Sequence, residues 1–423
     1  MGPRTVAAIG LYLTQVQQRG SAVDYKLFDA DNHYYEAEDA FLRFGDESVK
    51  RYIHWVQDGK RRNLMFGNRL STVPSNPTFN PIAKAGAFHA RLKELEEGKG
   101  EPELIHAFDN SRYGELEPLP APYRNRHERL EVMDRQGVER CFLFPTLGDC
   151  VEGLMHDNVP MAYKAFHAFN LWLEEDWGYG YQDRLYAPPY IPMLDPELAA
   201  QELDFVLNKG ARLVSLRPGP AGGRSPADTV WDPFWARLNE AGALAAYHAF
   251  GGETLYEESF ERMWGRQPVS DPRYQANLSA ALISDRGILD TVIALVLGNL
   301  FGRFPNVRVA SVEMGCNWVP YCLHVLDHAG GLLERRVEAF GVRVEQRPSE
   351  IFKEKVYVSP FPEEDVVGLT ELIGVDRVLF GSDWPHPEGN VEPIDYVSCL
   401  NKLSPEDVRK IMRDNALSLL SAP

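Results

Sequence analysis

Short apolar runs recur along the chain and are separated by longer segments whose apolar residues have helical spacing. The runs are LFDAD (27–31), RCFLFP (140–145), YAPPYIP (186–192), RLVSLRP (212–218), LAAYHAF (244–250), VRVASVE (307–313), KVYVSP (355–360) and RVLFGSD (377–383). Several are continuously apolar, which is typical of strands that are buried on both faces. We therefore predict eight strands.

Amphipathic segments between these runs predict helices. They cover 125–137, 161–177, 195–210, 232–242, 288–301, 319–341, 363–374 and 404–420. Gly137, Gly210, Gly242 and Gly374 end four of them, as glycine does where a helix stops in a left-handed residue. Ser404, with Asp407 three residues later, predicts the start of the last helix.

Eight strands that are each followed by a helix predict a (β/α)8 TIM barrel. A doubly wound open sheet is the alternative, but the glycine-rich turn that binds a dinucleotide after the first strand of such a sheet is missing. Residues 25–423 then form one barrel domain, and residues 1–24 are an N-terminal extension that is either an added helix or disordered.

Two connections are much longer than the rest. Residues from about 34 to 123 separate the first strand from its helix, and residues from about 251 to 283 follow the fifth strand. Both follow strands, so both are expected on the face of the barrel where the strands end, which carries the active site in barrel enzymes. We interpret them as lids or substrate covers.

Ionisable residues stand at the ends of three predicted strands. Asp29, Asp31 and His33 alternate in FDADNHYYE, so a regular strand would turn all three to one side. His248 ends the fifth run and Asp383 the eighth. In a closed barrel the first and eighth strands are neighbours, and two imidazoles would meet two carboxylates at one rim. This donor set suits a catalytic Zn²⁺ or Mn²⁺ ion, with Mg²⁺ or Fe as further possibilities.

The composition limits the kinds of binding partner that this chain can have. The net charge of −17 argues against nucleic acid, whose phosphates need clustered Lys and Arg. Five scattered cysteines without CxxC spacing suggest reduced thiols, and the apolar stretch VAAIGLYL is too short to span a bilayer. We expect a cytoplasmic enzyme that acts on a small molecule and has no membrane partner.

Four stretches resemble a known family. DxDxH at 29–33, YHAF at 247–250, VEMGCNWVP at 312–320 and GSDWPH at 381–386 are similar to motifs of the amidohydrolase superfamily. The closest resemblance is to the amidohydrolase-related branch that includes aminocarboxymuconate-semialdehyde, resorcylate and carboxyvanillate decarboxylases. It spans residues from about 25 to 420 and implies a metal held by Asp31, His33, His248 and Asp383. The first ligand is often His in the superfamily, and Asp31 favours a harder ion.

The same resemblance assigns chemistry to further residues. Asp383, Glu313 and His386 are the candidate catalytic residues, although the family commonly has a His where Glu313 stands. Glu313 is therefore either an acid/base or a residue that orients a ligand. Strand four offers Ser215 and Arg217 but no lysine to bridge two ions, so one ion is expected. Arg217 either binds a substrate carboxylate or makes a structural salt bridge.

Each residue also has a structural alternative. His33 and Asp383 could belong to turns, His248 could be a core histidine, and His386 a loop residue. The favoured function is a carboxy-lyase (decarboxylase) that acts on a carboxylated aromatic or unsaturated acid. A hydrolase that attacks an ester, lactone, amide or C–C bond with metal-activated water is the alternative, and an inactive barrel that serves as a binding protein is the third possibility. A homodimer is expected from the apolar stretch 288–301.

Overall fold

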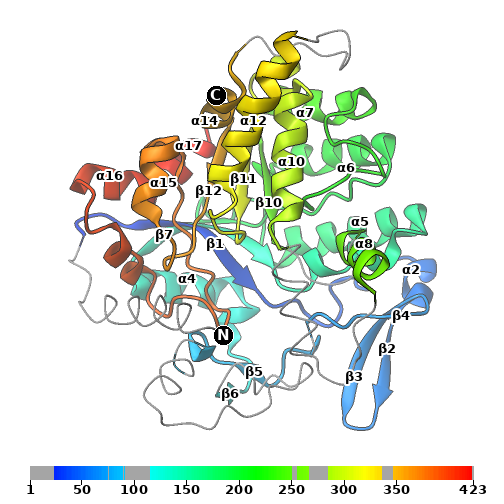
Figure 1. The fold of residues 1–423 in the computed structure, drawn as a ribbon. Coiled ribbons are helices and arrows are strands. Elements are labelled where there is room, and N and C mark those ends of the chain that lie inside the picture. The colour runs from blue at the N-terminus through cyan, green and yellow to red at the C-terminus, as the bar shows by residue number, and fades with distance from the viewer. Residues whose placement is uncertain are drawn as a thin grey trace.

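The structure is a computed structural model, and it describes residues 23–74, 76–88, 90, 115–249, 255–265, 284–335 and 346–421 (Figure 1). Residues 1–22 of the predicted extension 1–24 lie outside the described residues. The same holds for residues 91–114 of the first long connection and for all of the second except 255–265.

Seven of the eight predicted runs contain strands, and they form two parallel sheets. The first sheet has the order β1 (Leu27–Tyr34), β7 (Val138–Pro145) and β8 (Leu185–Tyr186). The second has the order β12 (Val356–Val358), β11 (Arg308–Val312), β10 (Leu244–His248) and β9 (Leu213–Leu216). The fold is therefore a mixed α/β fold with parallel sheets, as the alternation of the sequence predicted.

Backbone hydrogen bonds join the two sheets at both of their ends. Near β8, Tyr190 forms a parallel bridge to Ser215 of β9. At the other end, the eighth predicted run forms no strand of its own, but Leu379 N donates to Val358 O of β12 at 2.9 Å. Ala30 N of β1 donates in turn to Phe380 O at 2.8 Å. Residues 377–383 thus lie between β12 and β1.

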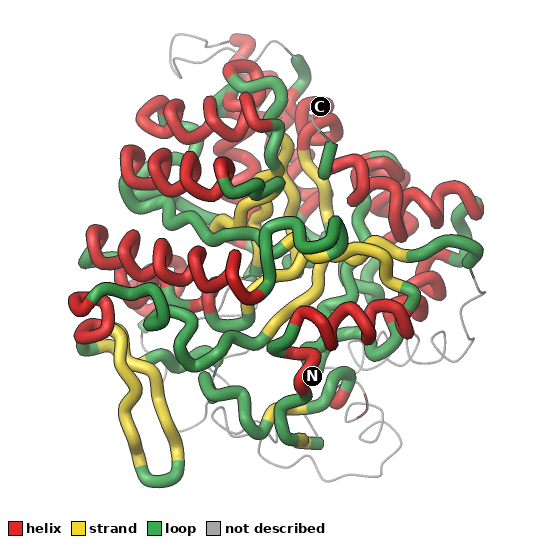
Figure 2. The backbone as a smooth tube through the Cα atoms, turned by 180° about the vertical axis from the view of Figure 1, so that it is seen from behind, coloured by secondary structure: helices red, strands yellow, loops and turns green. Residues whose placement is uncertain are grey.

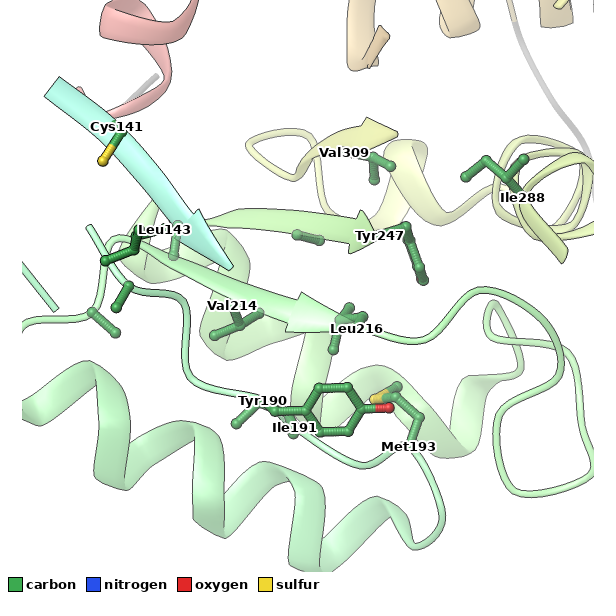
Figure 3. Packing of buried hydrophobic residues seen from close by; sticks show 14 of the residues in the cluster. Cys141, Leu143, Tyr190, Ile191, Met193, Val214, Leu216, Tyr247, Ile288 and Val309 are labelled. Atoms are coloured by element: carbon green, nitrogen blue, oxygen red, sulfur yellow. The ribbon is translucent and has the colours of Figure 1, made fainter. Parts of the chain in front are cut away.

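Alternate residues of the strands enter two different apolar clusters. Val214 and Tyr247 belong to the larger cluster, which the strands share with the surrounding helices (Figure 3). Leu213 and Ala246, their neighbours in the same strands, belong to a second cluster that also contains Phe28 of β1. Because side chains alternate along a strand, burial of both sets explains why the runs are continuously apolar.

Helices cover the outer faces of the sheets (Figures 1 and 2). In chain order they are α4 (Arg126–Gln136), α5 (Val159–Asp176), α6 (Pro196–Asn208), α7 (Asp232–Ala241), α10 (Arg286–Leu297), α11 (Leu300–Arg303), α12 (Val319–Arg335), α14 (Pro348–Lys355), α15 (Val366–Ile373), α16 (Pro405–Arg409) and α17 (Asn415–Leu419). Asn125 and Asp195 cap the starts of α4 and α6 with their side chains. Across the described residues, no helix has the length and apolar character needed to cross a membrane.

The connection between β1 and α4 contains structure that the sequence did not indicate. It holds α2 (Glu47–Tyr52), the antiparallel strands β2 (Ile53–Asp58), β3 (Arg61–Phe66) and β4 (Arg69–Leu70), and the pair β5 (Ile82–Ala83) and β6 (Leu116–Glu117). The β2–β3 ribbon projects from the body of the molecule (Figures 1 and 2). The described part of the second connection contains α8 (Leu255–Trp264).

The C-terminal helix is anchored by a buried arginine. Ser404 caps the start of α16 by accepting from Asp407 N, as predicted, and a π-helical turn at Lys410–Asp414 leads into α17. At the start of β11, Arg308 is 9% exposed and donates to Ser418 O, Leu419 O, Ser421 O and Gly242 O. A guanidinium at the C-terminus of a helix satisfies its open carbonyls and opposes the helix dipole.

Arg308→Ala should therefore destabilise the fold without changing how the ionisable residues at the strand ends are arranged. We expect a loss of about 2–3 kcal/mol in the free energy of unfolding, because several buried carbonyls lose their donor. Denaturant unfolding measures the loss. Arg224→Ala is the control: Arg224 is 60% exposed in its pair with Asp228, and the change should cost less than about 1 kcal/mol. Equal stability of both variants would contradict this anchoring role.

Candidate metal centre

The end of β1 is irregular, and this irregularity decides which of its polar side chains point to the same side of the strand. The register of β1 against β7 shifts between Asp29 and Asn32. A bulge breaks strict alternation, so the expectation that Asp29, Asp31 and His33 share one side is wrong for Asp29. The Asp29 carboxylate instead accepts from Asn32 Nδ2 at 2.9 Å and from Ser382 N at 2.9 Å. Asp31 and His33 alone enter the cluster described next.

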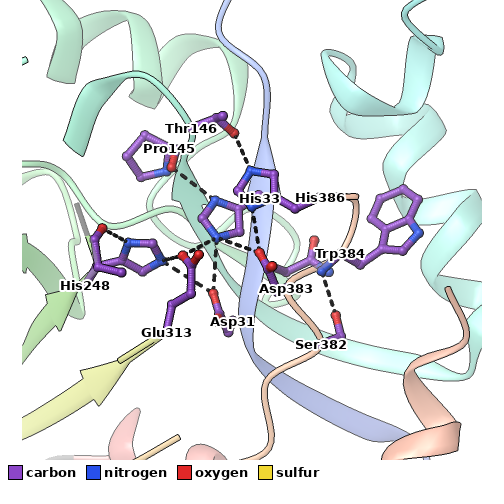
Figure 4. A network of polar contacts seen from close by, with 12 residues as sticks. Asp31, His33, Pro145, Thr146, His248, Glu313, Ser382, Asp383, Trp384 and His386 are labelled. Atoms are coloured by element: carbon purple, nitrogen blue, oxygen red, sulfur yellow. Dashed lines mark hydrogen bonds and ion pairs between the residues drawn. The ribbon is translucent and has the colours of Figure 1, made fainter. Parts of the chain in front are cut away.

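His33 lies at the centre of a group of carboxylates (Figure 4). His33 Nε2 is 3.2 Å from Asp31 Oδ1, 3.5 Å from Glu313 Oε2 and 3.4 Å from Asp383 Oδ1. His248 Nε2, at the end of β10, is 3.5 Å from Asp31 Oδ1 and 3.1 Å from Glu313 Oε2. The structure therefore brings together all four residues that the sequence proposed as ligands, and adds Glu313 to them.

Backbone carbonyls fix how both imidazoles are turned. His33 Nδ1 lies 3.0 Å from Pro145 O, and His248 Nδ1 lies 2.7 Å from Ala249 O. A carbonyl oxygen only accepts, so in both rings Nδ1 carries the hydrogen. In the neutral rings, Nε2 then has a free lone pair directed at the carboxylates, which is the arrangement of a metal-binding histidine.

The atoms that face one another are buried but lack hydrogen bonds. Asp31 Oδ1, His33 Nε2 and His248 Nε2 have no hydrogen-bond partner among the described residues. Asp383 Oδ1 also lacks an aligned hydrogen bond, although His386 Nδ1 is 2.6 Å away. Buried polar atoms are normally satisfied, so this exception requires an explanation.

A divalent cation fits these donors. Ligand atoms about 2.1 Å from one ion lie about 3.0–3.4 Å apart in octahedral or tetrahedral sites. The separations of 3.1–3.5 Å between the imidazole nitrogens and the carboxylate oxygens agree with this spacing. Asp31, His33, His248 and Glu313 each offer one donor atom, and all four atoms lie within 4.8 Å of one another.

The electrostatics of the cluster show the same need for positive charge. Burial, followed by the negative charge of Glu313, raises the pKa of Asp383 well above its usual value. Burial lowers the pKa of His33, but contacts with Asp31 and Glu313 outweigh it and raise this pKa to about 9. Without a bound cation, protons on these side chains thus reduce the net negative charge of the cluster.

Two acidic residues at strand ends have an unusual backbone. Glu313, directly after β11, has a φ of 56°, and Asp383 has a φ of 55°. This left-handed conformation costs a residue with a side chain about 1 kcal/mol. Such strain collects at functional sites, where the surrounding structure holds it in place. At both positions it accompanies a carboxylate that reaches the cluster.

The GSDWPH stretch explains how Asp383 comes so close to β1. Gly381 packs against Asp31, where an added Cβ would lie 2.5 Å from the Asp31 Cβ. Ser382 Oγ donates to Asp29 Oδ2 at 2.5 Å, and Asp383 N donates to Asp31 O at 2.8 Å. This motif therefore serves the close approach of two chain segments as well as the chemistry of Asp383.

His386 is held beside Asp383. Its Nδ1 lies 2.6 Å from Asp383 Oδ1, and its Nε2 lies 3.0 Å from Thr146 Oγ1. The single hydroxyl proton of Thr146 goes to Tyr34 O at 2.8 Å, so His386 Nε2 must donate to the hydroxyl. His386 does lie in a loop, but its side chain is only 12% exposed and contacts Asp383 directly.

Arg217 lies just after the end of β9 and outside the cluster. Its Nη1 is 3.6 Å from Glu152 Oε1, and its side chain is 16% exposed. Glu152 also accepts from Tyr190 Oη at 3.0 Å. The structural salt bridge that the sequence offered as an alternative is thus present.

Sequence reasoning missed Asp149, which contacts one of the imidazoles. Its Oδ2 is 3.2 Å from His248 Nδ1, and its Oδ1 accepts from Ser215 Oγ at 3.2 Å. Asp149 lies in a short 3-10 turn, η3 (Gly148–Cys150), shortly after β7. An acidic residue close behind a predicted strand was the available signal. Glu36, just after β1, holds this turn by accepting from Leu147 N and Gly148 N.

Comparisons with known proteins show which family this chain resembles. The family model described as amidohydrolase matches residues 105–421. The crystal structure of an amidohydrolase from Mycobacterium avium subsp. paratuberculosis K-10 is 36% identical to this chain. That match covers 95% of this chain and 100% of the other, with a TM-score of 0.83.

Two decarboxylases are more distant relatives. Gamma-resorcylate decarboxylase of Rhizobium radiobacter is 25% identical over 306 residues, which are 69% of this chain and 85% of that protein. The dihydroxybenzoic acid decarboxylase of Polaromonas sp. JS666 was solved with bound manganese and the inhibitor 2-nitroresorcinol. It shares the fold with a TM-score of 0.54 at 16% identity, over 94% of this chain and 97% of its own.

Asp149→Asn tests whether the second contact of His248 supports metal binding. We expect Mn²⁺ affinity to fall about 10–100-fold, as it does when a group that orients a metal-binding histidine is changed. Calorimetric titration of the metal-free protein measures the affinity. Asp157→Asn, at a residue that is 58% exposed and pairs with Arg69, is the control and should bind as the unchanged protein does. Unaltered affinity of Asp149→Asn would show that Asp149 only packs beside the imidazole.

Proposed function

The chain belongs to the amidohydrolase family of enzymes, and we propose that it is a carboxy-lyase with one divalent metal ion. Its substrate would be a carboxylated aromatic or unsaturated organic acid. The observation that carries the proposal is the convergence of Asp31, His33 and His248, whose buried donor atoms lack hydrogen-bond partners among the described residues. The similarity to gamma-resorcylate decarboxylase supports the choice of reaction.

We propose that the two sheets form one closed eight-stranded barrel with residues 377–383 as its last member. The bridges from Tyr190 to Ser215 and from Val358 to Val378 support closure. The second apolar cluster supports it too, because it takes residues from both sheets and Leu379 from the last segment. In this arrangement residues 25–423 are a single domain, with the long connections about 34–123 and 251–283 as insertions after its first and fifth strands.

Asp31, His33 and His248 would hold the ion, with Asp383 at the edge of the set. Carboxylates suit Mn²⁺ and Mg²⁺, whereas imidazoles suit Zn²⁺ and Fe as well. We favour Mn²⁺, because the Polaromonas decarboxylase was solved with manganese. When bound, such an ion acts as a Lewis acid that stabilises negative charge on a neighbouring oxygen.

Arg217 would bind the substrate and Asp383 would handle the proton. A guanidinium suits a substrate carboxylate, which it can bind through two parallel hydrogen bonds. During decarboxylation the C–C bond breaks, CO₂ leaves, and the electron pair stays on carbon. Asp383 gives its proton to that carbon, and His386, 2.6 Å from Asp383, passes on a replacement.

Two expectations stay predictions. The homodimer gains no support from α10, because Ile288, Val292, Leu295 and Val296 are already buried within the chain's own core. The cytoplasmic location likewise stays a prediction. The remaining functional alternatives are a hydrolase on the same scaffold and an inactive binding protein, and the following experiment separates them.

Metal removal tests the reaction directly. We expect the purified protein to hold about one equivalent of a divalent metal and to release CO₂ from a hydroxylated aromatic or muconate-like acid. Chelation should abolish turnover, and added Mn²⁺ or Zn²⁺ should restore it. Turnover of esters or lactones without CO₂ release would favour the hydrolase. A purified protein that contains no metal and takes up no added Mn²⁺ or Zn²⁺ would favour the inactive binding protein.

Arg217→Gln tests substrate recognition. Loss of a charge-assisted, two-pronged contact should raise KM for the carboxylated substrate about 10–100-fold and change kcat less. Arg217→Lys should recover part of the loss, because it restores charge but not the fork. Steady-state kinetics and thermal melting are measured together. A lower melting temperature with unchanged KM would mean that Arg217 serves only its salt bridge with Glu152.

A further inference from the structure

We propose that Arg129, on α4, is a positioning residue for the metal centre. Through Asn32 and Asp29 it holds the end of β1 against the segment 381–384. The inference rests on the proposed metal ion and deepens it, because it concerns what keeps the donor atoms in place before the ion binds. It follows from a buried chain of polar contacts that no step of the proposed reaction uses.

Arg129 is a buried cation without an ion pair. Its exposure is 0%, and among the described residues no carboxylate forms an ion pair with it. Its Nε donates to Pro122 O at 2.9 Å, and its Nη1 donates to Asn32 Oδ1 at 2.5 Å. The guanidinium carbon lies 4.5 Å from the centroid of the Trp384 ring, within range of a cation–π interaction. Burial of an arginine in this way is costly, so its contacts with Asn32 and Trp384 require an explanation.

Asn32 connects Arg129 to Asp29. It lies between Asp31 and His33 in β1. Its Oδ1 accepts from Arg129, while its Nδ2 donates to Asp29 Oδ2 at 2.9 Å. The amide has one accepting end and one donating end, so it can link a cation to a carboxylate in this orientation. A change at Arg129 therefore reaches the residue that separates two of the metal-binding side chains.

Asp29 joins the end of β1 to the segment that carries Asp383. Its Oδ1 accepts from Asp31 N at 3.2 Å and from Ser382 N at 2.9 Å, so one oxygen contacts both parts of the chain. Its Oδ2 accepts from Ser382 Oγ at 2.5 Å. Ser382 Oγ in turn accepts from Trp384 N at 3.1 Å (Figure 4). The chain of contacts thus returns to Trp384, whose ring lies against the guanidinium.

The same two parts of the chain are also joined through their backbones. Asp383 N donates to Asp31 O at 2.8 Å, and His33 N donates to Trp384 O at 2.8 Å. His33 Nε2 and Asp383 Oδ1, which are 3.4 Å apart, therefore keep their separation only while the two backbones keep theirs. Because a metal site tolerates displacements of only about 0.5 Å, a support that fixes both backbones affects binding directly.

This network differs from the metal cluster because its polar atoms are satisfied. Every side-chain oxygen and nitrogen of Asp29, Asn32 and Ser382 has a hydrogen-bond partner. The exposure of each of these residues is at most 1%. A buried polar network of this kind holds a single arrangement of the chain, because any shift would leave one of its groups unpaired. The network is therefore a support for the cluster and not a second binding site.

Arg129→Met tests the positioning role, because it removes the guanidinium and leaves a side chain of similar volume. We expect Mn²⁺ affinity to fall about 10–100-fold, as it does when a residue that orients a metal ligand is changed. Charge alone would act in the opposite direction, since loss of a neighbouring cation favours the binding of another. A weaker affinity thus reports the position of the donor atoms. Calorimetric titration of the metal-free protein measures the affinity, and the visible absorption of the Co²⁺-loaded protein should change as well.

Arg308→Met is the matched control. Arg308 is also a buried arginine that donates to backbone carbonyls, but it lies at the start of β11 and anchors the C-terminal helix. Its loss should lower the melting temperature and leave Mn²⁺ affinity and the Co²⁺ spectrum as they are in the unchanged protein. If Arg129→Met does not fold, Arg129→Lys takes its place. It keeps the charge but not the forked donors, and it should still bind Mn²⁺ more weakly than the unchanged protein.

A double-mutant cycle with Asp29→Asn tests whether Arg129 acts through the network. If both residues act through Asn32, the double variant should lose about as much Mn²⁺ affinity as the weaker of the two single variants. Additive losses, an unchanged or increased affinity in Arg129→Met, or an equal loss in Arg308→Met would each overturn the inference and leave the metal centre intact. An unchanged protein that binds no Mn²⁺ would instead overturn the centre, and the inference with it.

Discussion

Negative charge is crowded around two imidazoles at the ends of β1, β10 and β11, and the rest of the site is arranged around this crowding. Asp31 is 3% exposed, His33 1% and His248 3%, so water cannot disperse their charges. Carboxylates this close repel one another, and burial adds several kcal/mol for each uncompensated charge. A divalent cation relieves both costs at once. Protons on the imidazoles relieve them only in part, which the raised pKa of His33 reflects.

Surrounding groups maintain this arrangement from several directions. Pro145 O and Ala249 O fix the imidazoles, so Nε2 of each ring faces the carboxylates. The bulge in β1 turns Asp31 and His33 inward together and leaves Asp29 to join Ser382. These contacts are backbone-based or buried, and they give a rigid donor set before any ion arrives. Preorganisation of this kind is what tight metal binding and Lewis-acid chemistry require.

Much of this could be predicted from the sequence, and the reasons for success and failure differ by residue. Continuous apolar runs revealed seven strands, because burial on both faces leaves a clear pattern. Polar residues at the ends of those runs, such as His248 and Asp383, could be recognised because ionisable side chains are rare in an apolar core. The bulge at Asp29 was not predictable, since it depends on pairing with β7. Asp149 was missed because its contact with His248 comes from a turn between strands. The antiparallel strands between β1 and α4 do not fit the alternation of strands and helices. The contacts of Glu313 with both imidazoles depend on the pairing of β11 with β10.

The central claim is that one divalent cation is held by Asp31, His33 and His248. Anomalous diffraction at the manganese absorption edge, from crystals grown with Mn²⁺, tests it most directly. We expect a single strong anomalous peak within about 2.3 Å of Asp31 Oδ1, His33 Nε2 and His248 Nε2. A protein saturated with Mn²⁺ that shows no peak among these three atoms, or shows its peak at another place, would contradict it.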